Sequence, residues 1–150
     1  MEMILVSACL LGVNCKYDGK NNFHKEILNI KENYGIIPIC PEQLGGLTTP
    51  RLAAEIINGD GLDVLNNVAK VIRNDGVDVT EAFIKGANEA LRIAETMGIK
   101  KAILKTNSPS CGVGKIYDGS FTRTLIPGDG VTTALLKSKG IEVWTEESFD

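Results

Sequence analysis

Short, continuous apolar runs alternate with amphipathic segments along the 150 residues of this chain. Four runs have the pattern of strands that are buried on both faces, at residues 3–6, 36–39, 102–104 and 141–144. Helices are predicted between them, at residues 24–34, 81–97 and 132–139. Because strands and helices alternate, we expect parallel strands joined by right-handed crossovers. The predicted fold class is α/β, a single-domain three-layer sandwich around a mostly parallel, Rossmann-like, doubly wound sheet.

Turn and cap signals mark the ends of several of these elements. Gly35 is placed to end the first helix, and Thr80 is suited to cap the start of the second. Apolar residues flank Asn74-Asp75-Gly76, a strong turn signal, so a small hairpin is predicted near residues 68–79. The segment 107–130 is rich in Ser, Pro and Gly and is predicted to be a loop.

Composition and charge set limits on the partners of the chain. Hydrophobic residues make up 43% of the sequence and the net charge is −3, so we expect residues 1–150 to form one ordinary globular domain. Lys100-Lys101 is the only basic doublet, so we expect no large nucleic-acid partner. The apolar runs are too short to span a bilayer, so we expect no membrane partner and a cytoplasmic location.

Three of the four cysteines follow predicted strands. Cys9 lies just past the first strand, Cys40 at the end of the second, and Cys111 in the loop after the third. Because the carboxyl ends of parallel strands meet at one edge of a sheet, we expect the three thiols to converge. The alternative is that they are small buried core residues, as scattered cysteines commonly are. Their Gly and Pro neighbours favour a backbone shaped around a ligand instead.

Three thiolates at one site suit a soft metal or an iron–sulfur cluster. A structural zinc site needs a fourth ligand, but the chain has no Cys-x-x-Cys pair, and its one histidine, His24, falls on a predicted helix. The cysteines therefore favour a 4Fe-4S cluster with three anchored irons and one open iron. Cys15 lies six residues past Cys9. It is a candidate fourth ligand, a thiol beside the site, or a packed core thiol.

Polar residues next to these cysteines are candidates for catalysis. Glu42 lies two residues past Cys40, where a carboxylate could activate water as a general base, although a single Glu is commonly a solvated loop charge. Ser108 and Ser110 could donate hydrogen bonds to a substrate or to cluster sulfurs, or simply support a turn. The chain has no phosphate-binding glycine motif, so a nucleoside triphosphate or dinucleotide site has little support.

Several short motifs occur in order over essentially the whole chain. They are Ser7-Ala8-Cys9-Leu10-Leu11-Gly12, Tyr17-Asp18-Gly19, Cys40-Pro41-Glu42, Gly45-Gly46-Leu47, Pro50-Arg51, Ser108-Pro109-Ser110-Cys111-Gly112 and Tyr117-Asp118-Gly119. As a set they resemble the thiouracil desulfurase family. The resemblance implies that Cys9, Cys40 and Cys111 bind a 4Fe-4S cluster and that Cys15 is outside the ligand set.

The resemblance also implies an activity. It is the cluster-dependent, non-redox desulfuration of a small thiolated pyrimidine, in which the open iron takes the sulfur, Glu42 activates water, and sulfide is released. Ser108 is the second catalytic residue implied. Predicted substrate-binding positions within the same motifs are Ser7, Asp18, Arg51 and Ser110. The alternative is a non-catalytic metal or iron–sulfur binding module, such as a sulfur carrier or a regulator.

Overall fold

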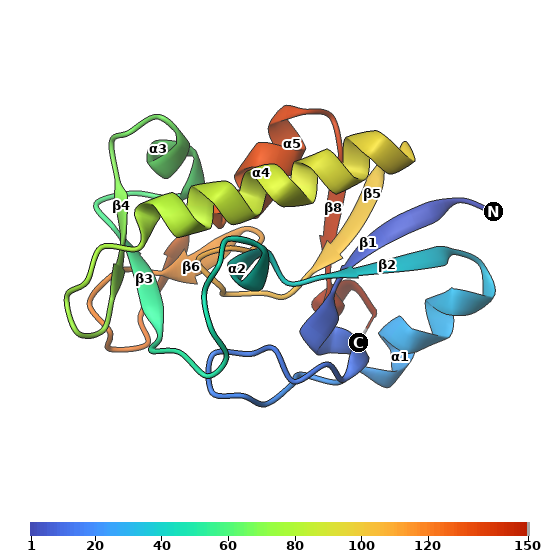
Figure 1. Cartoon of the computed structure of the whole chain (residues 1–150), viewed down its shortest axis with the longest axis horizontal. Coiled ribbons are helices and arrows are strands. Elements are labelled where there is room, and N and C mark those ends of the chain that lie inside the picture. The colour runs from blue at the N-terminus through green and yellow to red at the C-terminus, as the bar shows by residue number, and fades with distance from the viewer. Residues whose placement is uncertain (150) are drawn as a thin grey trace.

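Four parallel strands form the central sheet of the computed structural model, which describes residues 1–149 (Figure 1). They are β1 (Met3–Ser7), β2 (Gly35–Ile39), β5 (Lys101–Leu104) and β8 (Glu142–Thr145), in the order β2-β1-β5-β8. In the register, Leu5 pairs with Ile37 on one side and with Ala102 on the other. The chain passes from β1 to β2 and later returns to the other side of β1 with β5. The strand order therefore reverses between β1 and β5, the point at which open α/β sheets bind ligands.

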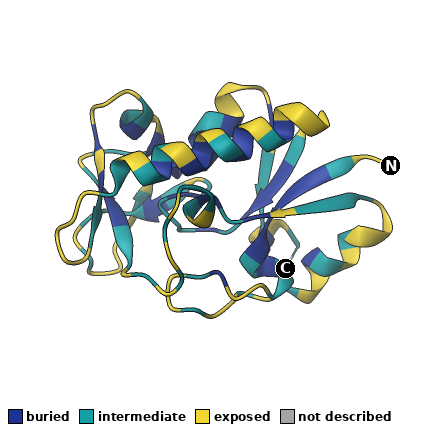
Figure 2. Ribbon diagram, viewed as in Figure 1, coloured by how far each residue is buried: buried dark blue, intermediate teal, exposed yellow. Residues whose placement is uncertain are grey.

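Helices cover both faces of the sheet because its strands are apolar on both sides. Helices α2 (Pro41–Leu44), α4 (Thr80–Met97) and α5 (Val131–Ser138) form one outer layer. The other layer contains α1 (Lys25–Leu28) and the 3-10 helices η1 (Ala8–Leu11), η2 (Asn29–Glu32) and η3 (Glu146–Phe149). Leu5 shares a buried cluster with Ala90 and Leu91 of α4, whereas Ile4 and Val6 point to the opposite cluster. This alternation confirms the predicted three-layer α/β sandwich, and Figure 2 shows that β1 is buried whereas β2, at the edge of the sheet, is mostly intermediate.

A second group of elements extends the molecule beyond the sheet, on the left of Figure 1. It contains α3 (Gly61–Leu65) and two antiparallel pairs, β3 (Ala54–Ile57) with β4 (Lys70–Arg73) and β6 (Lys115–Tyr117) with β7 (Leu125–Pro127). Ile56, Val71 and Ile116 form a core there with Phe83 and Ala87 of α4. The N-terminal half of α4 thus packs on this second core, while its C-terminal half packs on the sheet.

The predicted strands and the helices α4 and α5 are present, with ends that differ by a residue or two. The predicted helix at 24–34 is instead a short α1 continued by η2, and Gly35 begins β2 rather than ending a helix. Thr80 is not the cap of α4 but its first residue, preceded by Val79. Its hydroxyl accepts a hydrogen bond from the backbone N–H of Val71 in β4, at 2.9 Å, so a tertiary contact replaces the predicted cap.

The predicted turn at residues 74–76 is present, and Ile72 forms an antiparallel bridge with Asp78 across it. The longer partner of β4 is β3, which the sequence pattern did not reveal. The segment 107–130, expected to be a loop, also contains β6 and β7. Strands of three or four residues are too short for a readable alternation of apolar and polar positions.

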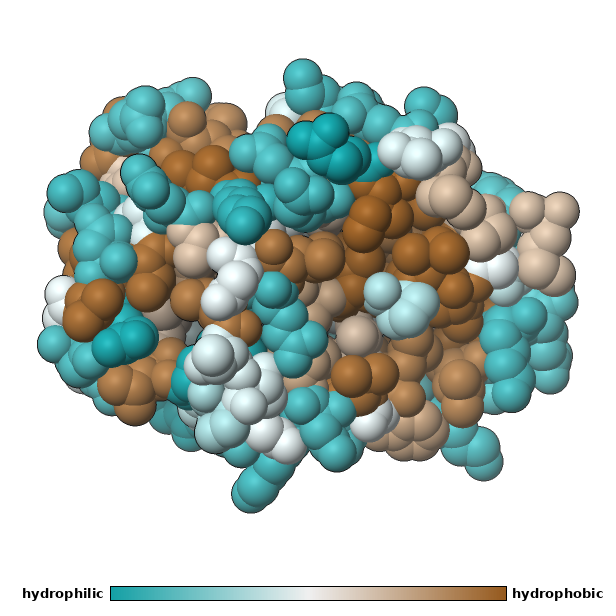
Figure 3. Space-filling view, in the orientation of Figure 1, coloured by the Kyte–Doolittle hydropathy of each residue, from teal (hydrophilic) through white to brown (hydrophobic). Residues whose placement is uncertain are grey.

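The surface of α4 differs along its two sides. Hydrophilic side chains gather along its outer side, and an apolar area lies between its C-terminal half and β2 (Figure 3). Met3, Ile37 and Ile93 are partly buried residues that pack against the sheet-side core. Within residues 1–149, no helix is both long and apolar enough to cross a membrane.

Candidate functional site

A cavity of about 590 Å³ opens where β1, β2 and β5 end. Its lining includes most of the site residues predicted from the sequence, namely Ser7, Cys9, Cys40, Glu42, Arg51, Ser108 and Cys111. Cys15 lines it as well. Segments about a hundred positions apart in the sequence therefore meet at the point where the strand order reverses.

Each of the three strand-end cysteines is held by its local backbone. Cys9 lies in η1, and its carbonyl oxygen accepts a hydrogen bond from the Asn22 N–H at 2.9 Å. Cys40 precedes α2 as its N-cap residue, with Pro41 as the first helical residue. Cys111 donates its N–H to Ser108 Oγ at 3.0 Å, and its carbonyl oxygen accepts a hydrogen bond from Thr133 Oγ1 at 2.9 Å.

Hydrogen bonds among the thiols set their protonation. The Cys15 thiol and the backbone N–H of Gln43 bond to Cys40 and lower its pKa to about 6, against the effect of burial. The Cys15 thiol also lowers the pKa of Cys9, together with the Asn22 side chain and the charge of Lys105. The same contacts raise the pKa of Cys15 far above the ordinary thiol value. In these contacts the Cys15 thiol is therefore the donor, and Cys9 and Cys40 are the acceptors.

Cys111 is buried, at 6% exposure, as Cys15 is, whereas Cys9 and Cys40 are partly exposed. Burial raises the pKa of Cys111 well above the ordinary value, although a hydrogen bond from Ser7 opposes the shift. Ser7 also accepts a hydrogen bond from the Lys105 N–H at 3.0 Å. The Ser7 side chain therefore links the ends of β1 and β5 beside Cys111.

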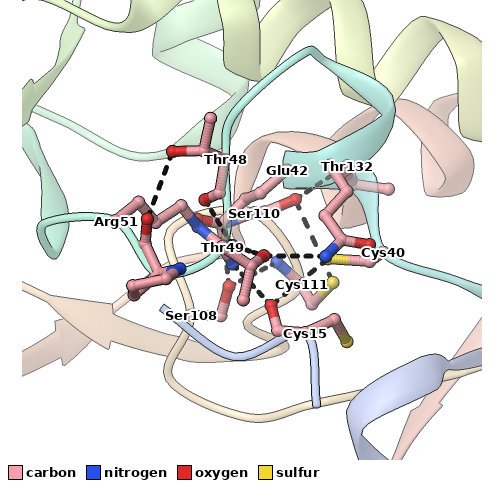
Figure 4. Close-up of polar contacts among 12 residues, drawn as sticks. Cys15, Cys40, Glu42, Thr48, Thr49, Arg51, Ser108, Ser110, Cys111 and Thr132 are labelled. Atoms are coloured by element: carbon pink, nitrogen blue, oxygen red, sulfur yellow. Dashed lines mark hydrogen bonds and ion pairs between the residues drawn. The ribbon is translucent and has the colours of Figure 1, made fainter. Parts of the chain in front are cut away.

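Glu42 lies in the first turn of α2, with its side chain about one fifth exposed, and pairs with Arg51 (Figure 4). Arg51 Nε donates to Glu42 Oε1 at 3.1 Å. Burial raises the pKa of Glu42, and the Arg51 charge opposes the shift. A carboxylate in this setting is more basic than a solvated one, which suits a general base.

Arg51 was expected to bind substrate, but most of its guanidinium is used within the protein. Besides Glu42, its partners are the Thr48 carbonyl oxygen at 3.2 Å, Thr49 Oγ1 at 2.9 Å and the Cys15 carbonyl oxygen at 2.9 Å. These contacts use four of its five N–H donors. In the structure, Arg51 links the segment that carries Glu42 to the loop that carries Cys15.

Of the remaining predicted residues, Ser108 lines the cavity, whereas the buried Ser110 and the exposed Asp18 do not. Ser108 Oγ lines the cavity and accepts hydrogen bonds from the N–H groups of Ser110 and Cys111, which leaves its own proton free to be donated to a bound molecule. Ser110 is 1% exposed, bonds to Thr132 Oγ1 at 2.9 Å and does not line the cavity. Asp18 pairs with Lys16 at 3.6 Å and is also outside the lining.

Several lining residues had no signal in the sequence. Asn22 and Lys105 lie beside Cys9, and Lys105 Nζ pairs with the buried Glu146 at 3.0 Å. At the opposite side, Glu55 accepts hydrogen bonds from the N–H groups of Gly119 and Phe121, which fixes the loop 118–124 over the cavity. Asn22 and Lys105 lie in loops, and Glu55 lies in β3, a strand that the hydrophobic pattern of the sequence did not predict.

The donor set was compared with what a metal centre requires. Across residues 1–149, no three His, Cys, Asp or Glu side chains lie close enough together to hold a single metal ion. A 4Fe-4S cluster is larger, and each cysteine that holds it binds a different iron. Thiols from three different loops around one cavity fit such a group.

The fold and the cavity define an α/β protein of Rossmann-like topology with a cysteine-rich site. The family model described as 2-thiouracil desulfurase matches residues 4–148, so the chain belongs to the 2-thiouracil desulfurase family. It is 46% identical over 148 residues to the uncharacterized protein YbbK of Bacillus subtilis (strain 168), covering 99% of this chain and 98% of YbbK. It also matches the solved structure of the [4Fe-4S]-dependent thiouracil desulfidase TudS, with a TM-score of 0.86 and 39% identity over 99% of this chain and 93% of that one.

Proposed function

We propose that this protein removes sulfur from a thiolated pyrimidine and releases it as sulfide. The observation that carries the proposal is the cavity whose lining brings together Cys9, Cys40 and Cys111, the partly buried carboxylate of Glu42, and Ser108. Membership of the 2-thiouracil desulfurase family and the match to TudS support the same reaction. We further propose that residues 1–150 act as one desulfurase domain, in the cytosol, where thiols stay reduced.

In this proposal, Cys9, Cys40 and Cys111 hold a 4Fe-4S cluster. Three cysteines leave one iron without a protein ligand, and that iron would supply a Lewis acid for the thiocarbonyl sulfur. Lys105 adds a positive charge near Cys9 that helps to balance the negative charge of the thiolates.

The residues of the chain do the acid–base work. Glu42 takes a proton from water, and the resulting hydroxide attacks the carbon that bears the sulfur. Ser108 donates a hydrogen bond from its hydroxyl to the pyrimidine and keeps its proton, which orients the ring and stabilises charge on it. The carbon–sulfur bond breaks, a carbonyl takes its place, and the sulfur leaves as sulfide, so water is consumed and no electrons are transferred. Arg51 keeps Glu42 in place throughout.

Anaerobic reconstitution tests the proposal directly. The protein should bind about four irons and four sulfides per chain, as one cubane cluster requires, and release sulfide from 2-thiouracil or 4-thiouridine. Alanine at Cys9, Cys40 or Cys111 should abolish the cluster. Stoichiometric zinc without iron would refute the cluster. A stable cluster without sulfide release from any thiolated base would instead favour the non-catalytic binding module.

A further inference from the structure

Asn107 is a polar residue of the cavity wall that the proposed reaction does not use. It lies directly before Ser108, and both residues line the cavity. Its side-chain oxygen, Oδ1, is buried, and within residues 1–149 no hydrogen bond reaches it. Native proteins rarely leave a buried polar atom unpaired, and such an atom calls for an explanation, such as a catalytic role or a bound molecule. The unpaired oxygen points to a partner that the chain itself does not supply.

The backbone holds this side chain in an unusual position. Asn107 has a φ of 68°, in the left-handed region that residues other than glycine rarely adopt. The preceding Thr106 is fixed by the buried Glu146, whose carboxylate accepts hydrogen bonds from the Thr106 N–H at 2.9 Å and from Thr106 Oγ1 at 3.1 Å. Asn107 itself forms a parallel bridge with Ile116. Residues that neighbouring contacts hold in sparsely populated conformations cluster at binding and active sites.

The backbone conformation alone does not account for Asn107. Asparagine is enriched at positive φ, and Asn58 has the same φ of 68°. Asn58, however, is exposed and lies outside the cavity lining, so solvent can satisfy its amide. What distinguishes Asn107 is the buried, unpaired oxygen beside the cavity.

We propose that Asn107 Oδ1 accepts a hydrogen bond from the ring N3–H of the thiolated pyrimidine, and that it thereby selects substrates that carry this hydrogen. The inference rests on the proposed function, which places the pyrimidine in this cavity. In both 2-thiouracil and 4-thiouracil, N3–H and a carbonyl oxygen lie side by side on the ring. Ser108 has a free hydroxyl donor for the carbonyl oxygen, and Asn107 has an acceptor for the N–H. The terminal torsion of asparagine is soft, so a rotation turns Oδ1 toward the cavity that the residue lines.

A glycine substitution separates the amide from the backbone conformation. Asn107→Gly removes the amide and leaves a residue that adopts positive φ without strain. Asn58→Gly is the matched control, because it makes the same change at the same φ, away from the cavity. Each protein is reconstituted anaerobically, analysed for iron and assayed for sulfide release from 2-thiouracil. The 1-methyl and 3-methyl derivatives of 2-thiouracil are then measured as inhibitors, because only the 3-methyl compound lacks the N3–H. Guanidinium unfolding of the cluster-free variants measures stability.

We expect Asn107→Gly to hold as much iron as the wild type and to raise the KM for 2-thiouracil about 10-fold, the value of one hydrogen bond. Asn58→Gly should leave the KM unchanged. Asn107→Gly should also weaken inhibition by the 1-methyl compound to a similar extent, but leave inhibition by the 3-methyl compound nearly unchanged, because that compound has no N3–H to lose.

An unchanged KM in Asn107→Gly would overturn the inference, and so would equal losses with the two methyl compounds. An unfolding midpoint that falls further in Asn107→Gly than in Asn58→Gly would also overturn it, since the amide would then have a structural partner. If the wild-type protein releases no sulfide from 2-thiouracil, the proposed function fails instead, so the two failures are distinguishable.

Discussion

Replacing Gly86 by alanine inserts a methyl group between α4 and α2, the short helix that carries Glu42. Gly86 is the only glycine inside α4. A Cβ atom there would overlap the carbonyl oxygen of Pro41 and lie 2.8 Å from its carbonyl carbon and 3.3 Å from the Gly45 nitrogen. The contact is with backbone, so no side chain can rotate away from it. The methyl group has to push α2 away from α4.

Two free-energy terms of opposite sign decide the stability of this variant. Alanine inside a helix is more favourable than glycine by about 1 kcal/mol. Overpacking of a close contact costs about 1–3 kcal/mol, and more where backbone has to move. We therefore expect a net loss of up to about 2 kcal/mol in the free energy of unfolding, where an exposed helical glycine would have shown a gain.

The effect on activity should exceed the effect on stability. Pro41 lies between Cys40 and Glu42, so a shift of α2 moves a proposed ligand and the proposed base together. Misplacing reacting groups by on the order of 1 Å can reduce a rate about 100-fold. We expect a loss of that size in sulfide release, with reduced retention of iron after reconstitution.

Guanidinium unfolding of the cluster-free protein and a sulfide-release assay of the reconstituted protein measure these effects. Asn88→Ala is the matched control, because Asn88 is exposed on α4 and should gain about 0.5 kcal/mol from helix propensity alone. If Gly86→Ala behaves like this control in both assays, α2 and α4 do not rely on the contact, and the reasoning is refuted.

The remaining predictions concern single groups of the site. Glu42→Gln should keep the iron content of the wild type and reduce sulfide release about 10²–10⁴-fold, the usual contribution of a general base; unchanged turnover would remove Glu42 from the mechanism. In the cluster-free protein, iodoacetamide should alkylate Cys40 at a rate that rises through pH about 6, because the thiolate forms above its pKa. Cys111 should stay unreactive in that range, since burial raises its pKa; peptide mass spectrometry distinguishes the two. Glu55→Ala leaves two backbone N–H groups of the loop 118–124 without their acceptor, and should cost about 1–3 kcal/mol and speed proteolysis of that loop.

The central sheet could be predicted because its strands are short apolar runs, and the two inner strands, β1 and β5, are buried on both faces. Runs such as Ile4-Leu5-Val6 have no polar residue to interrupt them, and the helices between them require parallel pairing. The parallel topology then predicts that residues after different strands lie near one another. The positions of Cys9, Cys40 and Cys111 in the lining of one cavity agree with that expectation.

Contacts between loops could not be predicted in the same way. The hydrogen bonds of Arg51 to Glu42 and to the Cys15 carbonyl oxygen join segments 9 and 36 residues apart, and no periodic pattern encodes them. The connection between β3 and β4 contains α3 rather than a tight turn, so no turn motif in the sequence predicts that these two strands pair. Gly45 and Gly86 allow the backbones of α2 and α4 to lie close together, and nothing in the sequence around these two glycines predicts that contact.

The site therefore depends on two kinds of constraint. The parallel sheet brings the cysteines to one edge, but strand-end loops are free to vary and do not by themselves fix a carboxylate relative to the thiols. That relation comes from α2, which rests on the backbone of α4 through Gly45 and Gly86, and from Arg51, which binds both Glu42 and the Cys15 loop. A chain that kept the cysteines but lost these contacts could still bind a cluster, yet its carboxylate would have no fixed position from which to deliver water.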